Sequence, residues 1–191
     1  ELAAQEDNLS SVAFRLFGET LYKKHPYRFD VLGTVASIGG LSRKSLRDYY
    51  ARHFPASEMT LSIVGDVDPA RVIRKVTGLF GAEPRKKPEL PEVAREAPAR
   101  EQGPVEVWRF LPRQQAHLVV GFPGVTLVDQ DRHALEVLST ILSGQGGRLF
   151  VELRDKKGLA YRVSAFSLEG IDPGYFAVYI ATSPDNLAAA M

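Results

Sequence analysis

The fold is best predicted from the stretch Glu152-Leu153-Arg154-Asp155-Lys156-Lys157-Gly158-Leu159-Ala160-Tyr161-Arg162-Val163. This stretch predicts the end of a helix, a turn at Gly158 and the start of a strand. Arg154 and Tyr161 therefore lie at one helix-to-strand junction, which presents a fixed cation and a phenol. Both residues also have a purely structural explanation, because a cation is favoured near a helix C-terminus and tyrosine is favoured in strands.

The residues around this stretch predict an α+β fold, in which helices and antiparallel strands are mixed along the chain. Strands are expected at 105–111, 116–122, 159–167 and 175–182. The last two strands flank Ile171-Asp172-Pro173-Gly174, a sequence typical of a tight turn. We therefore expect a hairpin in the last part of the chain.

The first eighty residues predict three helices and one strand. Helical spacing of apolar residues begins near Leu9, a second helix is expected at 42–54 after the cap Ser42, and a third at 69–80 after the cap Asp68. Alternation at 59–63 predicts a half-buried strand. This part of the chain therefore combines helices with a strand, as the later part does.

A proline-rich segment at 83–104 gives the clearest boundary. It holds five of the twelve prolines, with scattered charges and almost nothing to bury, which is typical of a semi-rigid linker. We predict the end of a first αβ subdomain at 1–82, the linker at 83–104 and a second, truncated subdomain of related architecture at 105–191. Each subdomain is expected to hold a mixed, mainly antiparallel sheet with packed helices.

The composition excludes several kinds of partner and chemistry. The 24 basic and 23 acidic side chains give a net charge of +1, which is too balanced for a nucleic-acid groove or a polybasic membrane surface. No apolar run is long enough for membrane insertion. The absence of cysteine excludes disulfides, thiolate metal sites and a cysteine nucleophile within these residues.

Two stretches near the start add a further pattern. Glu1-Leu2-Ala3-Ala4-Gln5-Glu6-Asp7-Asn8 opens a helix, and His25-Pro26-Tyr27-Arg28-Phe29-Asp30-Val31-Leu32-Gly33-Thr34 follows it. Taken alone, Glu1 is an acid in the first turn of a helix, where the helix dipole favours it, and Glu6 is a solvated helix residue. Together with residues 152–163, these stretches resemble the pitrilysin/insulinase family of M16-type zinc metallopeptidases, also called inverzincins, along nearly the whole chain.

The resemblance implies a zinc cofactor and assigns roles to three residues. In that family a His-x-x-Glu-His helix supplies two ligands and the general base, and a later carboxylate supplies the third ligand. Glu1 would be that carboxylate, while Arg154 and Tyr161 would bind the substrate backbone and stabilise the oxyanion. If Glu1 is a ligand, however, the chain belongs to the zinc-bearing half, and Arg154 and Tyr161 could equally be a structural echo of the catalytic pair.

The zinc-binding helix itself is missing from this sequence. The four histidines are far apart, and none has a partner at the spacing that a zinc helix needs: His25, His53, His117 and His133. We expect His25 and His53 at the surface and His117 in a strand. The chain is therefore expected to be an internal piece of a longer protein and to be inactive alone.

The resemblance implies that the complete protein is a hydrolase, a protease that cleaves extended peptides with zinc-activated water. Its expected partners are a peptide or unfolded protein substrate and a homologous second half or partner subunit. A bacterial periplasm or cell envelope location is expected from the resemblance alone. Two alternatives stay open: a non-catalytic family member that acts as a scaffold or partner subunit, and a peptide-binding α+β module without chemistry.

Overall fold

The computed structural model describes residues 1–81 and 103–191, and contacts divide the chain into two compact units. One unit joins Glu1–Thr34 to Val93–Met191, and the other is Val35–Glu92. Almost all of the predicted linker lies outside the described residues. The boundaries predicted at 82 and 104 separate two homologous subdomains, whereas the two units are defined by contacts. The predicted boundaries therefore stay a prediction.

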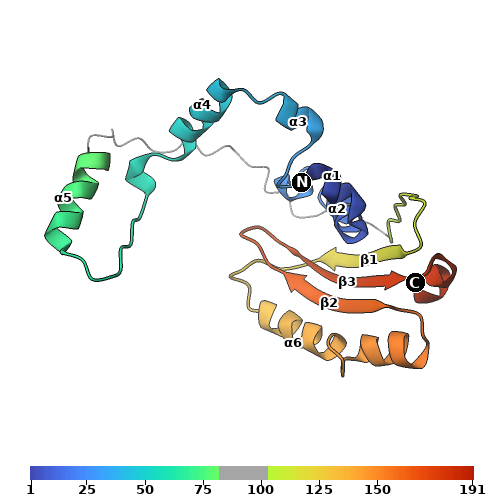
Figure 1. Cartoon of the computed structure of the whole chain (residues 1–191). Helices are drawn as coiled ribbons and strands as arrows, with labels where there is room; N and C mark the ends of the chain where they lie inside the picture. Colours follow the sequence, from blue (N-terminus) through green and yellow to red (C-terminus); the bar gives the residue numbers. More distant parts are fainter. Residues whose placement is uncertain (82–102) are drawn as a thin grey trace. The chain divides into compact units, whose positions relative to one another are not determined.

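A three-stranded antiparallel sheet organises the first unit (Figure 1). The central strand is β3 (Tyr175–Thr182), which pairs with β1 (Ala116–Pro123) on one side and β2 (Arg162–Leu168) on the other. Strands β2 and β3 form the predicted hairpin. The combination of helices with an antiparallel sheet confirms the α+β class.

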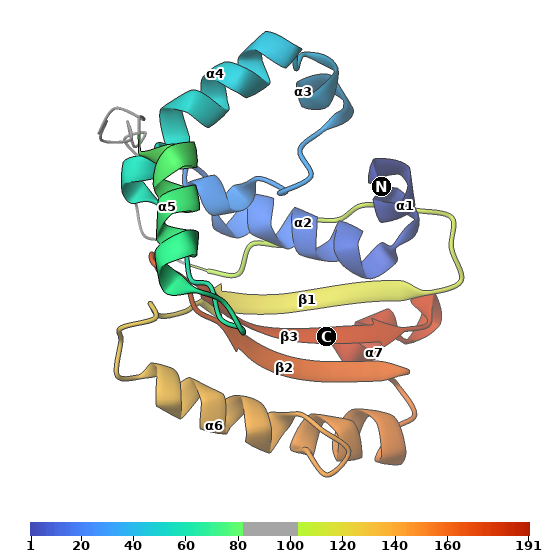
Figure 2. The same cartoon turned by 60° about the vertical axis from the view of Figure 1, so that its left-hand side comes forward.

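Helices cover both faces of this sheet (Figure 2). Helices α1 (Leu2–Asp7) and α2 (Leu9–Leu21) lie on one face, and α6 (Arg132–Leu142) and the π-helical turn η3 (Phe150–Lys156) lie on the other. The single predicted helix at the N-terminus is broken at Asn8, which is extended and accepts a 3.1 Å hydrogen bond from the Ser11 amide as the cap of α2. Shorter helical turns complete the unit: η1 (Pro26–Arg28), η4 (Pro184–Asn186) and α7 (Leu187–Ala190).

Alternate residues of β3 build two apolar layers, as the pleat of a strand requires. On the α2 face, the Phe14 ring lies 5.6 Å from the ring of Tyr179. On the η3 face, Ile180 is buried with Val163, and Leu153 packs against them. The sheet is thus anchored to helices on both sides.

The second unit consists of helices and turns, namely α3 (Val35–Gly39), α4 (Arg43–His53), η2 (Ala56–Glu58) and α5 (Pro69–Phe80). Ser42 forms a reciprocal capping box with Ser45 at the start of α4. The Asp68 side chain accepts a 2.9 Å hydrogen bond from the Ala70 amide at the start of α5. Both predicted helix starts are therefore confirmed.

Two predicted strands are wrong. Residues 59–63 and 105–111 form no strand in the described parts of the chain. A strand forms only where a neighbour satisfies its backbone groups, and no described segment pairs with either one. Leu61 and Phe110 are exposed. The alternating apolar side chains of both segments therefore have no covering layer among the residues that the structure describes.

The described helices also bear on membrane insertion. None of them combines the length and the apolar character that crossing a bilayer requires.

Candidate functional site

Glu1 stands at the N-cap of α1 and is exposed. Its carbonyl oxygen accepts a 2.9 Å hydrogen bond from the Gln5 amide, which begins the helix. Its side chain makes no capping hydrogen bond. The Glu1 carboxylate therefore does not cap the helix and is free to bind another group.

Glu1 does not make a metal site by itself. Catalytic zinc takes three protein ligands and keeps one position open for water. Within residues 1–81 and 103–191, no group of three or more histidine, cysteine, aspartate or glutamate side chains could hold a metal ion. The residues present here do not fit a complete zinc site, so zinc bound through Glu1 would need ligands from another segment.

The predicted junction of Arg154 and Tyr161 is present. Arg154 lies in the last turn of η3, Tyr161 immediately precedes β2, and Gly158 between them has a φ of 62°, which favours glycine. The Arg154 guanidinium lies 4.7 Å from the centroid of the Phe150 ring. The Tyr161 amide donates a 2.8 Å hydrogen bond to the Ala181 carbonyl. Both side chains are exposed, so their polar groups are presented to solvent from an ordered backbone.

The sheet separates Glu1 from Arg154. Helix α1 lies with α2 on one face, whereas η3 packs on the opposite face (Figure 2). A single site that used both side chains would have to span the thickness of the sheet. The arrangement therefore does not bring the three predicted site residues together within this unit.

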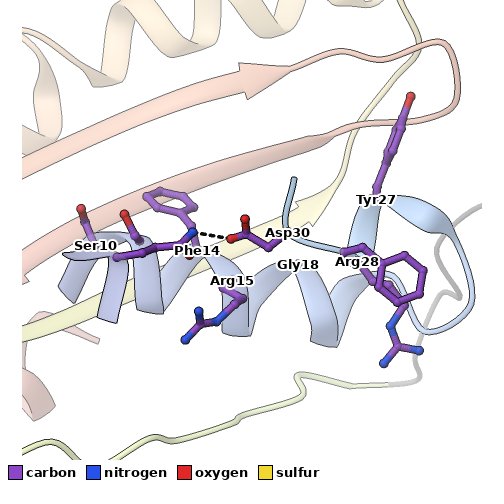
Figure 3. A pocket seen from close by; sticks show the side chains of 10 residues that line it. Ser10, Phe14, Arg15, Gly18, Tyr27, Arg28 and Asp30 are labelled. Carbon is purple, nitrogen blue, oxygen red and sulfur yellow. Dashed lines mark hydrogen bonds between the residues drawn. The ribbon is translucent and has the colours of Figure 1, made fainter. Parts of the chain in front are cut away.

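A pocket of about 330 Å³ opens between α2 and the loop that follows it (Figure 3). Phe14 and Arg15 line it from α2, and Tyr27 and Asp30 line it from the loop. The side-chain Nε2 of Gln5 donates a hydrogen bond to the Asp30 carboxylate. The side-chain oxygen of Gln5, Oε1, is buried without a hydrogen-bond partner among the described residues. The pocket thus offers aromatic surface and polar groups together, and its lining residue Gln5 lies one helical turn after Glu1.

Glu6 is exposed on α1, as predicted for a solvated helix residue, and two arginines bind its carboxylate. Its carboxylate accepts hydrogen bonds from Arg15 in α2 and, at 2.7 Å, from Arg109. The bond from Arg15 is the largest of the causes that lower the pKa of Glu6, and the bond from Arg109 adds to it. These bonds tie α1 to α2 and to the segment before β1.

His25 is buried, so the expectation that it lies at the surface is wrong. Only 3% of the residue is exposed. Its Nε2 lies 3.1 Å from Asp172 Oδ2 in the turn between β2 and β3, and its Nδ1 accepts a 3.2 Å hydrogen bond from the Tyr27 amide. The partner Asp172 lies 147 residues away in the sequence, and no short-range signal predicts such a contact.

His117 lies in β1, as predicted. Tyr179 Oη lies 2.8 Å from His117 Nδ1, while His117 Nε2 is buried with no hydrogen-bond partner in the described part of the chain. Desolvation lowers the pKa of His117 from its ordinary value of 6.5, because burial penalises the charged form of the ring.

This burial predicts a pH effect on stability. As the pH falls through about 6.5, the unfolded chain binds a proton at His117 that the folded chain resists, so the free energy of unfolding falls. We expect His117→Gln to lose less stability than the wild type between about pH 7.5 and about pH 5. Urea unfolding at both pH values measures this difference. His133→Gln, at an exposed histidine of α6, is the control, and equal losses in all three proteins would contradict the assignment.

Comparison with known proteins decides the family. Residues 40–191 match the family model described as the peptidase M16 inactive domain. The chain belongs to the M16 peptidase family. An uncharacterized zinc protease of Streptomyces coelicolor is 33% identical to this M16 chain over 193 residues, which cover 98% of the chain and 42% of that protein. An uncharacterized zinc protease of Rickettsia bellii is 28% identical over 191 residues and is covered to 44%.

A solved structure agrees with this assignment. The crystal structure of the peptidase M16 inactive domain from Pseudomonas fluorescens matches with a TM-score of 0.73 and 27% identity, and the match covers 95% of the M16 chain and 43% of that structure. The M16 chain thus spans less than half the length of these relatives. Its recognition as M16-type is confirmed, whereas the narrower names pitrilysin and insulinase and the roles of Glu1, Arg154 and Tyr161 stay predictions.

Proposed function

We propose that the complete protein is a zinc-dependent endopeptidase that cleaves extended peptides with zinc-activated water, and that this chain is inactive alone. The likeness to proteins named zinc proteases over 98% of the chain carries the proposal. Zinc would supply a polarised water as the nucleophile. Glu1 is the residue of this chain that we propose as a zinc ligand, and the other ligands would come from the rest of the protein.

The exposed apolar surface supports the proposal of a homologous second half or partner subunit. Helices α4 and α5 contain no buried residue, and the apolar side chains of Leu46, Tyr50, Ile73 and Leu79 are exposed. Large exposed apolar surface is typical of interaction sites in stable proteins. The relatives hold more than twice the length of this chain, which leaves room for a segment that covers these helices.

The sheet offers an edge for an extended peptide. Ser143 Oγ bonds both the amide and the carbonyl of Ala165, each at 2.6 Å, so part of the outer edge of β2 is occupied. Strand β1 pairs only with β3 in the described residues. We therefore propose β1 as the edge at which a peptide substrate could add as a further strand.

Arg154 and Tyr161 are proposed to contact the substrate in a site completed by another part of the protein. A guanidinium and a phenol both donate hydrogen bonds to developing negative charge. We expect Arg154→Ala and Tyr161→Phe each to lower kcat/KM of the complete protein on the order of 100-fold, as for the loss of one oxyanion donor. Cleavage of a quenched peptide measures both effects.

A matched control separates this role from helix stability. Lys156→Ala removes a neighbouring cation of η3 whose 2.5 Å hydrogen bond to Glu152 is exposed, and we expect its kcat/KM to stay near the wild-type value. If Arg154→Ala and Tyr161→Phe behave like this control, the pair is a structural echo and has no catalytic role.

The non-catalytic scaffold remains the second candidate. The matched family model describes an inactive domain, and the residues described here hold no metal cluster. A complete protein that binds no zinc and cleaves no peptide would favour the scaffold. The bacterial periplasm or cell envelope stays a proposal for its location, which fractionation of a bacterial host would test.

A further inference from the structure

We propose that His25 and Asp172 form a latch that fastens the N-terminal segment, residues 1–30, to the turn between β2 and β3. The His25 side chain is buried, and its Nε2 lies 3.1 Å from Asp172 Oδ2. The chain places these residues in the same compact unit. The latch goes beyond the proposed function, because it requires neither a metal nor a substrate.

The hydrogen bonds of His25 fix the form of its ring. Nδ1 accepts a hydrogen bond from the Tyr27 amide, so Nε2 carries the proton and donates it to the Asp172 carboxylate. A neutral donor to a carboxylate forms a charge-assisted hydrogen bond. One side chain thus caps the turn η1 and holds the hairpin at the same time.

Two tyrosines surround the pair. Tyr22 Oη donates a 3.1 Å hydrogen bond to the Pro173 carbonyl, and the Asp172 amide donates a 3.4 Å hydrogen bond to Tyr27 Oη. Burial raises the pKa of Tyr22 above its ordinary value of 10.0, so its hydroxyl stays a donor at alkaline pH as well as at neutral pH. In Figure 3 the Tyr27 side chain points away from the α2 helix.

The turn is shaped to receive this tyrosine. A Cβ built on Gly170 would lie 2.5 Å from Tyr27 Oη and 2.9 Å from the Asp172 carbonyl oxygen, which is too close for any larger residue without a shift. Tyr27 and the turn therefore fit because residue 170 has no side chain. The hairpin and the segment 22–27 meet through hydrogen bonds and close packing rather than through apolar contact alone.

The N-terminal segment that carries His25 is also bonded to α1, through Asp30 in the loop after η1. Asp30 accepts hydrogen bonds from the Leu32 amide, at 2.8 Å, and from the Gln5 side chain. Gln5 lies one helical turn after Glu1. The hairpin turn is thus bonded to His25, and α1 is bonded to Asp30, five residues further along the same segment. That the latch also positions Glu1 as a ligand is a consequence that rests on the proposed function.

Amide hydrogen exchange on the complete protein tests the latch. His25→Asn keeps an oxygen that can cap the Tyr27 amide but is too short to reach Asp172, and Asp172→Ala removes the other partner from the partly exposed side of the pair. We expect amides in α1 and in residues 22–30 to exchange about tenfold faster in each variant, as for the loss of one charged hydrogen bond. The double variant should be no faster than either single variant, because both remove the same interaction.

Three results would overturn the latch. These are exchange in residues 1–30 that matches the wild type, exchange that accelerates equally in β3, and effects of the two substitutions that multiply in the double variant. His133→Asn, at an exposed histidine in α6, should exchange like the wild type. If the wild-type protein cleaves no peptide, the proposed function fails, whereas the exchange rates still decide the latch.

Discussion

Glu1→Gln in the complete protein is expected to lose both bound zinc and peptide cleavage. A carboxylate supplies negative charge to the metal, whereas the amide of glutamine has the same shape and no charge, and zinc sites draw on charged or strongly donating ligands. Because changes to groups that only support a ligand cost about 10- to 100-fold, loss of the ligand itself should lower cleavage on the order of 100-fold or more. Zinc content by elemental analysis and cleavage of a quenched, unstructured peptide measure the two losses.

Glu136→Gln provides the matched control. Glu136 is an exposed glutamate in α6, on the face of the sheet away from α1. We expect this variant to keep its zinc and its activity. A Glu1→Gln protein that behaves in the same way would remove Glu1 from the metal site, and the carboxylate at the start of α1 would then serve only the helix.

Of the proposed substitutions, Ile180→Ala is expected to lower the free energy of unfolding most. Ile180 is 3% exposed, lies opposite Val163 in β2 and Leu118 in β1, and belongs to the main apolar cluster. Deleting its side chain leaves a cavity between the sheet and η3, and such changes cost about 2–5 kcal/mol. Urea unfolding of the complete protein, followed by a probe in this unit, measures the free energy of unfolding.

Ile171→Ala makes the same chemical change at the hairpin turn, where the isoleucine is 78% exposed. We expect this control to change stability by no more than about 0.5 kcal/mol. If Ile180→Ala costs no more than the control, the layer between β3 and η3 is not the core of the unit.

Local signals predicted the parts of the fold that depend on local interactions. Ser42 and Asp68 each accept hydrogen bonds from amides within three residues, so helix starts can be read from a short window. The turn at 171–174 is likewise predictable from its own residues, because proline fixes its own φ and Gly174 has no Cβ that would clash with the Leu168 carbonyl. The junction of Arg154, Gly158 and Tyr161 was predictable for the same reason.

Local signals could not predict contacts between residues that are far apart in the sequence. Alternation at 59–63 and 105–111 indicates an apolar face, but a strand also needs a partner strand, and the described residues supply none. The bond between His25 and Asp172 depends on how the N-terminal segment lies on the hairpin. The sequence around His25 resembles a surface loop, and only the contact with residues 172 and 173 shows why it is buried.

In the candidate site, too, the local features were predictable and the long-range arrangement was not. The positions of Glu1 at a helix start and Arg154 at a helix end follow from nearby residues. Their separation by the sheet follows from the order β1-β3-β2 and from the faces that α2 and η3 cover. Under the proposed function, each of these residues would therefore act in a site completed by other parts of the protein.

Chelator-sensitive cleavage is the most direct test of the central claim that this M16 chain is part of a zinc peptidase. The complete protein, with any homologous partner subunit present, would be incubated with a quenched unstructured peptide, beside the present chain alone. We predict cleavage by the complete protein that a chelator stops and added zinc restores, and no cleavage by the chain alone. The absence of cleavage by the complete protein, or cleavage that is indifferent to the chelator, would contradict the account.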